Sequence, residues 1–227
     1  MIAESQTAGR GRLGRRFHSP PNENLYTSCV LRPRIDVGSA PTLIPTAAIA
    51  VADAIAEELA STDDVEIKWP NDVLLAGRKT SGLLMELQAE AAQVGHAVMG
   101  IGVNLNVDRE TFPEDFRSLA TSLRSHCGRR IDRIAFTSRL YSILERTLDE
   151  HAARGFASLR KRYEAYFRMP GRRIRIVEMD GSARDAVAVG IDEDGALLVD
   201  RDDGTRERVI AGDVTLAKDT GATGATG

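Results

Sequence analysis

The sequence predicts an α+β fold, with a mixed or antiparallel sheet in the larger N-terminal part and a small β-barrel-like domain at the C-terminal end. Apolar residues follow a helical period over 42–60, 136–148 and 156–167. Short β-rich runs joined by glycine-bearing turns fill 65–103, which favours antiparallel neighbours. After the Met-Pro-Gly at 169–171 the pattern changes to short alternating runs, and this change separates the two parts.

The strands of the N-terminal part are predicted from apolar and β-branched runs that lie between turn residues. They are expected at 24–31, 65–68, 73–75, 80–88 and 94–103. The helix predicted at 42–60 carries many alanines on its apolar face, and these small side chains favour close packing on a sheet.

Three Asp-Gly pairs separate the short runs between 172 and 216, and Asp-Gly is a strong signal for a hairpin turn. Evenly spaced turns of this kind are typical of a small β-barrel of about fifty residues. The predicted division is therefore a larger domain at 1–168 and a small domain at 169–217. The Gly-Ala-Thr repeat at 218–227 predicts a disordered tail.

The composition is that of a soluble protein: 227 residues, 42% hydrophobic and 28% charged. The net charge of −3 argues against a nucleic-acid partner. Cys29 and Cys127 lie far apart, so neither a disulfide framework nor a zinc site is implied. No apolar run is expected to reach the roughly 20 residues of a membrane helix, and no signal-peptide pattern opens the chain. We therefore predict a cytoplasmic protein with no membrane partner.

The segment GRGRLGRR at 9–16, called the Arg loop below, concentrates four arginines between glycines. Glycines let backbone N–H groups approach a ligand closely, and guanidinium groups offer planar donor pairs to phosphate or carboxylate. The alternatives are a solvated surface loop or an RGG-like nucleic-acid segment. RGG segments recur in disordered sequence, whereas this one occurs once between two predicted strands. The pattern favours an anion-binding loop.

The segment KWPND at 68–72 is the second candidate. Pro70 removes a ladder donor, so a strand must stop or kink there, leaving the side chains of Asn71 and Asp72 free at a strand end. Asp72 is a candidate Mg²⁺ ligand, or it orients a ligand hydroxyl. An ordinary β-turn also selects Asn-Asp, and this segment alone does not decide between the two interpretations.

Lys79 begins a predicted strand and can reach a phosphate as a point charge, although a solvent-facing edge lysine would give the same pattern. Gly100 and Gly102 lie inside an apolar strand, which indicates close approach of a backbone or a ligand. Asn104 follows, and a plain turn residue is the alternative there. The sequence has no Rossmann fingerprint, P-loop or nucleophile elbow, so covalent catalysis by the protein is not suggested.

Taken in order, GRGRLGR, SPPNENLY, KWPND, GRKTSGLLMEL and GIGVNLN resemble the motifs of biotin protein ligases, from residue 1 to about 216. The resemblance implies an α+β catalytic domain related to class II synthetases, followed by a small SH3-like barrel. It also implies that biotin and ATP, with Mg²⁺, form biotinyl-5′-AMP and pyrophosphate. A lysine of the biotin carboxyl carrier protein of acetyl-CoA carboxylase, or of a related carboxylase, then takes the biotinyl group.

The resemblance also implies roles for individual residues. The two catalytic residues implied are Lys79, which bridges the biotin carboxylate and the phosphate, and Arg12, in the loop that orders over the adenylate. Arg12 and Lys79 also belong to the biotin site, with Gln6, Gly9, Arg10, Gly82 and Gly100. The implied ATP site combines Arg12, Arg15, Asn71, Asp72 and Asn104, with Asp72 on the metal side.

The sequence departs from the family pattern in three ways. It has no upstream Ser-Thr-Asn signature, so we expect either a truncated start or a degenerate copy that binds biotin weakly and is poorly stable. Phe17 stands where the family usually has tryptophan. The DNA-binding domain of regulatory members is absent, so repression is not expected. The alternative functions are a lipoate ligase or octanoyltransferase of the same fold, or an inactive biotin-binding remnant, and a homodimer is left open.

Overall fold

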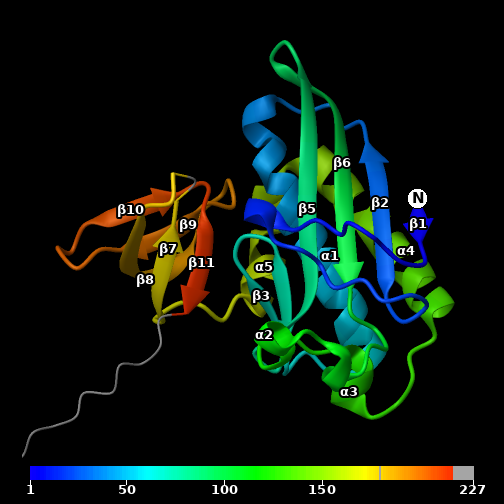
Figure 1. Ribbon diagram of the computed structural model, residues 1–227. Helices are drawn as coiled ribbons and strands as arrows, with labels where there is room; N and C mark the ends of the chain where they lie inside the picture. The colour runs from blue at the N-terminus through cyan, green and yellow to red at the C-terminus, as the bar shows by residue number, and fades with distance from the viewer. Residues whose placement is uncertain (179, 217–227) are drawn as a thin grey trace, which may run out of the picture.

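Two antiparallel sheets dominate the computed structural model, which describes residues 1–178 and 180–216 (Figure 1). The larger sheet has helices α1 and α4 behind it, and the smaller sheet packs beside it. This arrangement confirms the predicted α+β class with a β-rich C-terminal part. The tail predicted at 218–227 lies outside the described residues.

The larger sheet has six strands in the order β1-β2-β6-β5-β4-β3, and every neighbouring pair is antiparallel. Antiparallel pairing follows from the short turns that join the last four strands. The strands are β1 (Ile2–Ala3), β2 (Leu25–Leu31), β3 (Val65–Lys68), β4 (Asp72–Leu75), β5 (Arg78–Glu90) and β6 (Gln93–Val103). The predicted strands are confirmed, but β5 extends beyond its predicted limits at both ends.

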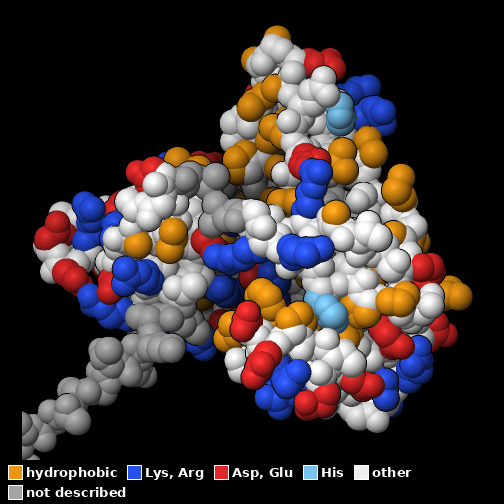
Figure 2. All heavy atoms as spheres, viewed as in Figure 1, with side chains coloured by type: hydrophobic (Ala, Val, Ile, Leu, Met, Phe, Trp, Pro, Cys, Tyr) orange, Lys and Arg blue, Asp and Glu red, His pale blue; other side chains and the backbone are white. Residues whose placement is uncertain are grey.

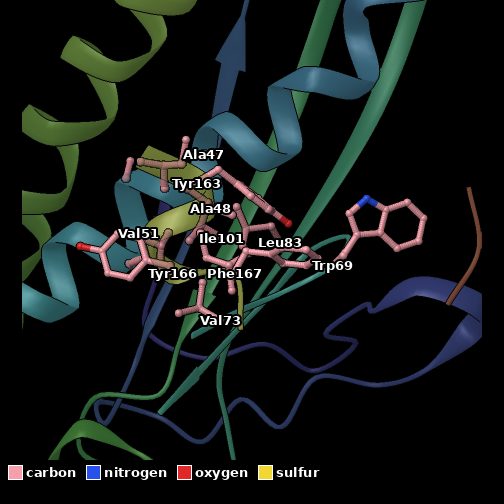
Figure 3. Packing of buried hydrophobic residues seen from close by; sticks show 14 of the residues in the cluster. Ala47, Ala48, Val51, Trp69, Val73, Leu83, Ile101, Tyr163, Tyr166 and Phe167 are labelled. Carbon is pink, nitrogen blue, oxygen red and sulfur yellow. The ribbon is translucent and has the colours of Figure 1, made fainter. Parts of the chain in front are cut away.

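Helix α1 (Leu43–Leu59) continues from a 3-10 turn, η2 (Val37–Thr42), and forms the centre of the core. Its alanines are buried, which lets the helix axis lie close to the sheet. Figure 3 shows Ala47 and Ala48 gathered with Leu83 and Ile101 from β5 and β6. The helix predicted at 42–60 is therefore confirmed.

The combined helical segment Val37–Leu59 is long and apolar enough to meet the length and composition of a membrane span. This corrects the expectation that no apolar run would reach that length. However, 78% of its most apolar window is buried inside the fold. A helix that is apolar on nearly all sides is also what a protein core requires, because it has no face left for water.

The remaining helices come after strand β6 in the sequence. They are α2 (Glu114–Arg117), α3 (Leu123–Cys127), α4 (Arg133–Arg154) and α5 (Arg160–Tyr166), with 3-10 turns η3 (Arg109–Thr111) and η4 (Phe156–Ser158). The helix predicted at 156–167 is divided into η4 and the shorter α5. Its apolar residues still face the core, since Phe156 and Tyr163 are buried against each other.

The smaller sheet has five antiparallel strands in the order β10-β9-β8-β7-β11. They are β7 (Arg173–Val177), β8 (Ala183–Ile191), β9 (Leu197–Asp200), β10 (Arg206–Val209) and β11 (Asp213–Leu216). Alternate residues such as Ile174 and Ile176 are fully buried, as a half-buried strand requires. The predicted short strands are confirmed, whereas a closed SH3-like barrel and the exact boundaries 1–168 and 169–217 stay predictions.

His151 provides a test of how the core responds to acid. Its side chain is buried on α4, Nε2 lies 2.7 Å from Thr42 Oγ1, and burial lowers the pKa of the imidazole. Because the folded pKa lies below the unfolded value, stability is complete above about pH 6.5 and falls as the pH drops further. We expect His151→Gln to reduce the loss of unfolding free energy between about pH 7 and pH 5, as measured by urea unfolding.

His96→Gln is the control, since it removes a histidine from β6 outside this contact. Equal acid sensitivity of the wild type and His151→Gln would contradict the assignment.

Candidate active site between the Arg loop and the central sheet

The Arg loop folds as a closed turn between β1 and β2. Arg10 and Arg16 pair as an isolated antiparallel bridge, and the Gly11 N–H donates to the Arg15 carbonyl at 2.7 Å. A 3-10 turn, η1 (Arg12–Gly14), forms the tip, and Gly14 has φ +72°. Glycine is favoured at this φ because it has no Cβ to clash. The loop is thus an organised turn held by its own backbone hydrogen bonds.

Gly9 lies at a close crossing of chain segments. A Cβ at Gly9 would lie 2.7 Å from the Phe17 carbonyl oxygen and 2.9 Å from both Gln6 Oε1 and Ser19 Oγ. The Ser19 hydroxyl donates to Gln6 Oε1 at 2.8 Å, which holds the Gln6 side chain beside Gly9. The structure therefore brings together Gln6 and Gly9, two of the residues predicted for biotin.

A cleft of about 770 Å³ lies between the Arg loop and β5. Across it, Arg10 Nη1 approaches Glu86 Oε1 at 3.6 Å. The cleft is lined by Ala8, Gly9, Arg10, Gly11, Arg12, Gly14, Arg15, Arg16, Leu84 and Glu86. Four guanidinium groups against one carboxylate make this lining strongly cationic, which suits an anionic ligand.

Arg12 connects the Arg loop to two other parts of the molecule. Its Nη1 donates to Asn71 Oδ1 at 3.2 Å and its Nη2 to the Gly212 carbonyl at 2.8 Å. Burial lowers the pKa of the guanidinium, and the charges of Asp213 and Asp72 partly offset this effect. A partly desolvated cation with donors to spare interacts strongly with an anion, because little water screens it.

Asn71 is not free, contrary to the expectation for KWPND. Its Nδ2 donates to the Leu83 carbonyl at 2.7 Å while its Oδ1 accepts from Arg12. The residue is buried, so both ends of the amide need partners. The Asn71 side chain is not free because the strand end at Pro70 faces a neighbouring strand and the Arg loop rather than water.

Asp72 is also engaged. Lys79 Nζ donates to Asp72 Oδ1 at 2.5 Å, and the Asp72 side chain is only 15% exposed. The backbone of Lys79 is paired on both sides: with Leu74 of β4 on one, and on the other its N–H donates to the Leu119 carbonyl at 2.8 Å and its carbonyl accepts from the Thr121 N–H at 2.9 Å. These contacts argue against the interpretation of Lys79 as a solvent-facing edge lysine.

A protein-held metal centre does not fit these contacts. Asp72 offers one carboxylate that is already paired with a lysine, and residues 1–178 and 180–216 contain no group of three or more metal-ligating side chains. Mg²⁺ commonly binds through one or two carboxylates together with substrate phosphates. The described residues would therefore offer Mg²⁺ at most the Asp72 carboxylate, and phosphate oxygens would have to supply its other ligands.

Glycines form a smooth strip on the sheet face opposite α1. Strand register places Tyr26, Gly102, Gly82 and Asp72 in one row across β2, β6, β5 and β4. A Cβ at Gly102 would lie 2.7 Å from the Phe17 ring, and one at Gly82 would lie 3.0 Å from Lys79 Nζ. Phe17 therefore lies directly over Gly102, where a Cβ would force a shift, and the end of the Lys79 side chain lies over Gly82, where a Cβ would make a tight contact.

Gly100 differs from this pair. A Cβ there would meet the Leu84 carbonyl oxygen at 3.5 Å, which is ordinary contact. The predicted biotin role of Gly100 stays a prediction, and the tight position is its neighbour Gly102. Sequence reasoning noted Gly102 but did not identify Phe17 as the side chain against it, because no local pattern links residues so far apart.

Asn104 is buried, and its amide is used within the protein. Its Oδ1 accepts from Asn24 Nδ2 at 3.3 Å, and its Nδ2 donates to the Thr121 carbonyl at 3.2 Å. Since Thr121 bonds to Lys79, Asn104 braces the segment that flanks the lysine. A direct contact with ATP stays a prediction.

The smaller sheet contributes contacts that sequence reasoning missed. Arg15 forms an ion pair with Asp213, and Trp69 Nε1 donates to the Gly195 carbonyl at 3.0 Å. Figure 2 shows Lys and Arg side chains gathered where the two halves of the molecule meet. Contacts of this kind have no signature in the sequence, because the partners lie more than a hundred positions apart.

Known proteins resemble this chain both in sequence and in architecture. Residues 1–104 match the Biotin/lipoate A/B protein ligase family, and residues 171–216 match the Biotin protein ligase C terminal domain. The biotin--[acetyl-CoA-carboxylase] ligase of Paracoccus denitrificans is 32% identical over 88% of this chain and 82% of its own length. The same-named ligase of Mycobacterium tuberculosis is 34% identical over 94% of this chain and 77% of its own length.

The biotin protein ligase of Aquifex aeolicus, solved in complex with biotin and ATP, superimposes with a TM-score of 0.81. It is 26% identical and the match covers 95% of this chain and 87% of that one. The bifunctional ligase/repressor BirA of Bacillus subtilis is 35% identical, and the match spans 65% of its length. The sequence and fold thus place the chain in the class of biotin/lipoate-type ligases. Within that class, this chain belongs to the biotin protein ligase family.

The glycine strip generates a prediction about stability. Gly102→Ala should displace the Phe17 ring and lower the free energy of unfolding by about 1–3 kcal/mol, as overpacking commonly does. Gly100→Ala is the matched control on the same strand, and it should be tolerated because its Cβ has ordinary space. Urea unfolding of both variants without ligand checks this. Equal stability of the two variants would show that Phe17 does not constrain Gly102.

Proposed function

We propose that this chain is an ATP-dependent biotin protein ligase. It would convert biotin and ATP to biotinyl-5′-AMP and then biotinylate a lysine of the biotin carboxyl carrier protein of acetyl-CoA carboxylase or a related carboxylase. One observation carries the proposal: Arg12, which lines the cationic cleft, donates to Asn71, and the next residue, Asp72, accepts from Lys79, whose side chain lies over Gly82. The names of the family relatives and the bound biotin and ATP of the Aquifex ligase support it.

The first half-reaction brings two anions together. A biotin carboxylate oxygen attacks the α-phosphorus of ATP, the bond from that phosphorus to the bridging oxygen breaks, and pyrophosphate leaves with the electron pair. Repulsion between the anions must be offset by fixed cations. We assign this to Lys79, held by Asp72, and to Arg12, held by Asn71 and Gly212. Catalysis of this type depends on positioning and electrostatics.

The remaining residues are assigned either to biotin or to the nucleotide. Gln6, Gly9 and Arg10 would contact biotin at the Arg loop, with Gly82 and Gly100 as the flat surface beneath it. Arg15 would contact the ATP phosphates. Asn71 and Asp72 would contact the nucleotide and its Mg²⁺. Asn104 would support this end indirectly through Thr121.

The second half-reaction is acyl transfer. The neutral amine of the acceptor lysine attacks the carbonyl carbon of biotinyl-5′-AMP, a C–N bond forms, the C–O bond to phosphate breaks, and AMP leaves with the electron pair. The amine proton passes to solvent. Because the mixed anhydride hydrolyses readily, the Arg loop would also protect it from water.

A lipoate substrate is the alternative that the family description admits, since the matched N-terminal family includes lipoate ligases. The match of 171–216 to the C-terminal domain of biotin protein ligases favours biotin. Competition between biotin and lipoate for the purified protein, read by isothermal titration, distinguishes them. Preferential lipoate binding would overturn the biotin assignment.

Lys79→Ala tests the electrostatic role. Losing one preorganised charge of this kind typically lowers the rate on the order of 10²–10³-fold. We expect single-turnover formation of biotinyl-AMP to fall by that factor while the thermal unfolding temperature changes little. Lys161→Ala, an exposed position on helix α5, is the control and should leave adenylation unchanged. Normal adenylation by Lys79→Ala would remove Lys79 from the catalytic assignment.

Arg12→Gly tests retention of the intermediate. The variant loses the contacts to Asn71 and Gly212 that hold the loop over the cleft. We expect biotinyl-AMP to escape and to biotinylate lysines of a bystander protein, detected by streptavidin blotting. A variant that keeps its adenylate and labels only the carrier would indicate that Arg12 does not close the site.

A further inference from the structure

Lysine is scarce in this chain. Of the 30 Lys and Arg residues only four are lysines, Lys68, Lys79, Lys161 and Lys218, although lysine is among the commonest residues of soluble proteins. The segment 1–67, which includes the Arg loop, carries no lysine. The cleft shows the same choice, since its described lining includes four arginines and no lysine. Guanidinium groups therefore supply the cationic field of the cleft.

Two of the lysines are associated with Asp72. Lys79 Nζ donates to Asp72 Oδ1 at 2.5 Å, and the half-buried Lys68 stands directly opposite Asp72 on the neighbouring strand β3. A lysine that donates to a carboxylate does so as an ammonium, which has no lone pair with which to attack an acyl group. The Lys79 amine is therefore not a nucleophile while this contact lasts.

The exposed lysine of the described residues lies away from the cleft. Lys161 is on α5, and α5 packs against α1, where the Tyr166 hydroxyl donates to Asp53 Oδ1 at 2.7 Å. Helix α1 covers the face of the larger sheet opposite the glycine strip, so the Lys161 amine is on the other side of that sheet from the cleft. Lys218 lies outside the described residues.

The choice of cation matters for the chemistry of an acyl-adenylate. A neutral amine that attacks the carbonyl carbon of biotinyl-5′-AMP forms a C–N bond, the C–O bond to phosphate breaks, AMP leaves with the electron pair, and the amine proton passes to solvent. A lysine amine, with an ordinary pKa of about 10.4, is neutral in a small fraction of molecules near neutral pH. A guanidinium, with a pKa above about 12, stays protonated. Arginine therefore provides charge without a nucleophile.

We propose that the arginines at the cleft are a specificity element of the ligase. They attract the anionic substrates but offer the reactive intermediate no amine, so the chain does not biotinylate itself and the intermediate is kept for an acceptor lysine. The inference rests on the proposed function and deepens it, because it states how the ligase distinguishes an acceptor lysine from its own residues. It follows that a lysine placed at the cleft becomes biotinylated.

Two variants place a lysine at the cleft, and a matched control places one elsewhere. Arg16→Lys keeps the charge of an exposed lining residue that donates to the Thr7 carbonyl at 3.3 Å. Ala8→Lys adds an amine at another exposed lining position and leaves every arginine in place. Arg146→Lys is the control, since Arg146 is exposed on α4, behind the sheet (Figure 1).

Each protein would be incubated with biotin, ATP and Mg²⁺ without an acceptor protein. Peptide mass spectrometry after cleavage at glutamate would then quantify the biotin at each amine, per biotinyl-AMP formed. We expect positions 8 and 16 to carry about tenfold more biotin than position 146, because the intermediate is held beside them. The wild type should carry little. Labelling at positions 8 and 16 no higher than at position 146, or heavy labelling of Lys79 or Lys161 in the wild type, would overturn the proposal.

A readout that does not depend on activity completes the test. An amine-reactive biotin ester, added to the same proteins without ATP, measures the ordinary reactivity of each amine, and positions 16 and 146 should then be labelled to a similar extent. If the ester gave the same ratio between these positions as biotin with ATP, exposure alone would explain the labelling and the proposal would fail.

The proposed function can fail separately, if the wild type forms no biotinyl-AMP. Synthetic biotinyl-5′-AMP supplied to the same variants would still decide whether the cleft directs the acyl group to positions 8 and 16. Preferential labelling there, relative to the ester, would support the proposal, and labelling equal to that at position 146 would overturn it.

Discussion

The organisation of the site depends on the hydrogen bonds that the partly buried guanidinium of Arg12 donates. Placing a charge where water is scarce is unfavourable unless acceptors surround it. Here the acceptors come from Asn71 at a strand end of the larger sheet and from the Gly212 carbonyl of the smaller one. The requirement to satisfy one cation therefore joins the Arg loop to both sheets and sets the position of the cleft.

Close packing on the sheet face has a complementary effect. The row Tyr26, Gly102, Gly82 and Asp72 places two glycines side by side in adjacent strands. Because they have no side chains, Phe17 and Lys79 can lie directly on the backbone. The opposite face of β5 and β6 carries Leu83 and Ile101 against α1, so the strand alternation separates core from site. One hairpin thereby contributes one face to the core and the other to the candidate site.

The electrostatic contrast between the whole chain and its cleft follows from this arrangement. The chain carries a net charge of −3, yet four arginines line the cleft. The carboxylates nearest to them, Asp72, Asp213 and Glu86, pair with cations, and they orient those cations more than they neutralise the cleft. A local cationic field of this kind attracts anionic substrates without making the protein a general polyanion binder.

Local patterns in the sequence determined most of the architecture and the types of residue in the site. Apolar and β-branched runs between turn residues predicted the strands of the larger sheet, and alternating runs with Asp-Gly turns predicted those of the smaller one. The alanine-rich helix at 42–60 matched α1. These signals arise between near neighbours. The Arg loop, KWPND and Lys79 were recognisable for the same reason. Tertiary structure alone decided that Asp72 pairs with Lys79, that Gly102 faces Phe17, and that Arg12 and Arg15 meet the Gly212–Asp213 turn. Those contacts join residues from different strands and sheets, and the energy of burying and pairing them depends on the folded environment rather than on sequence neighbours.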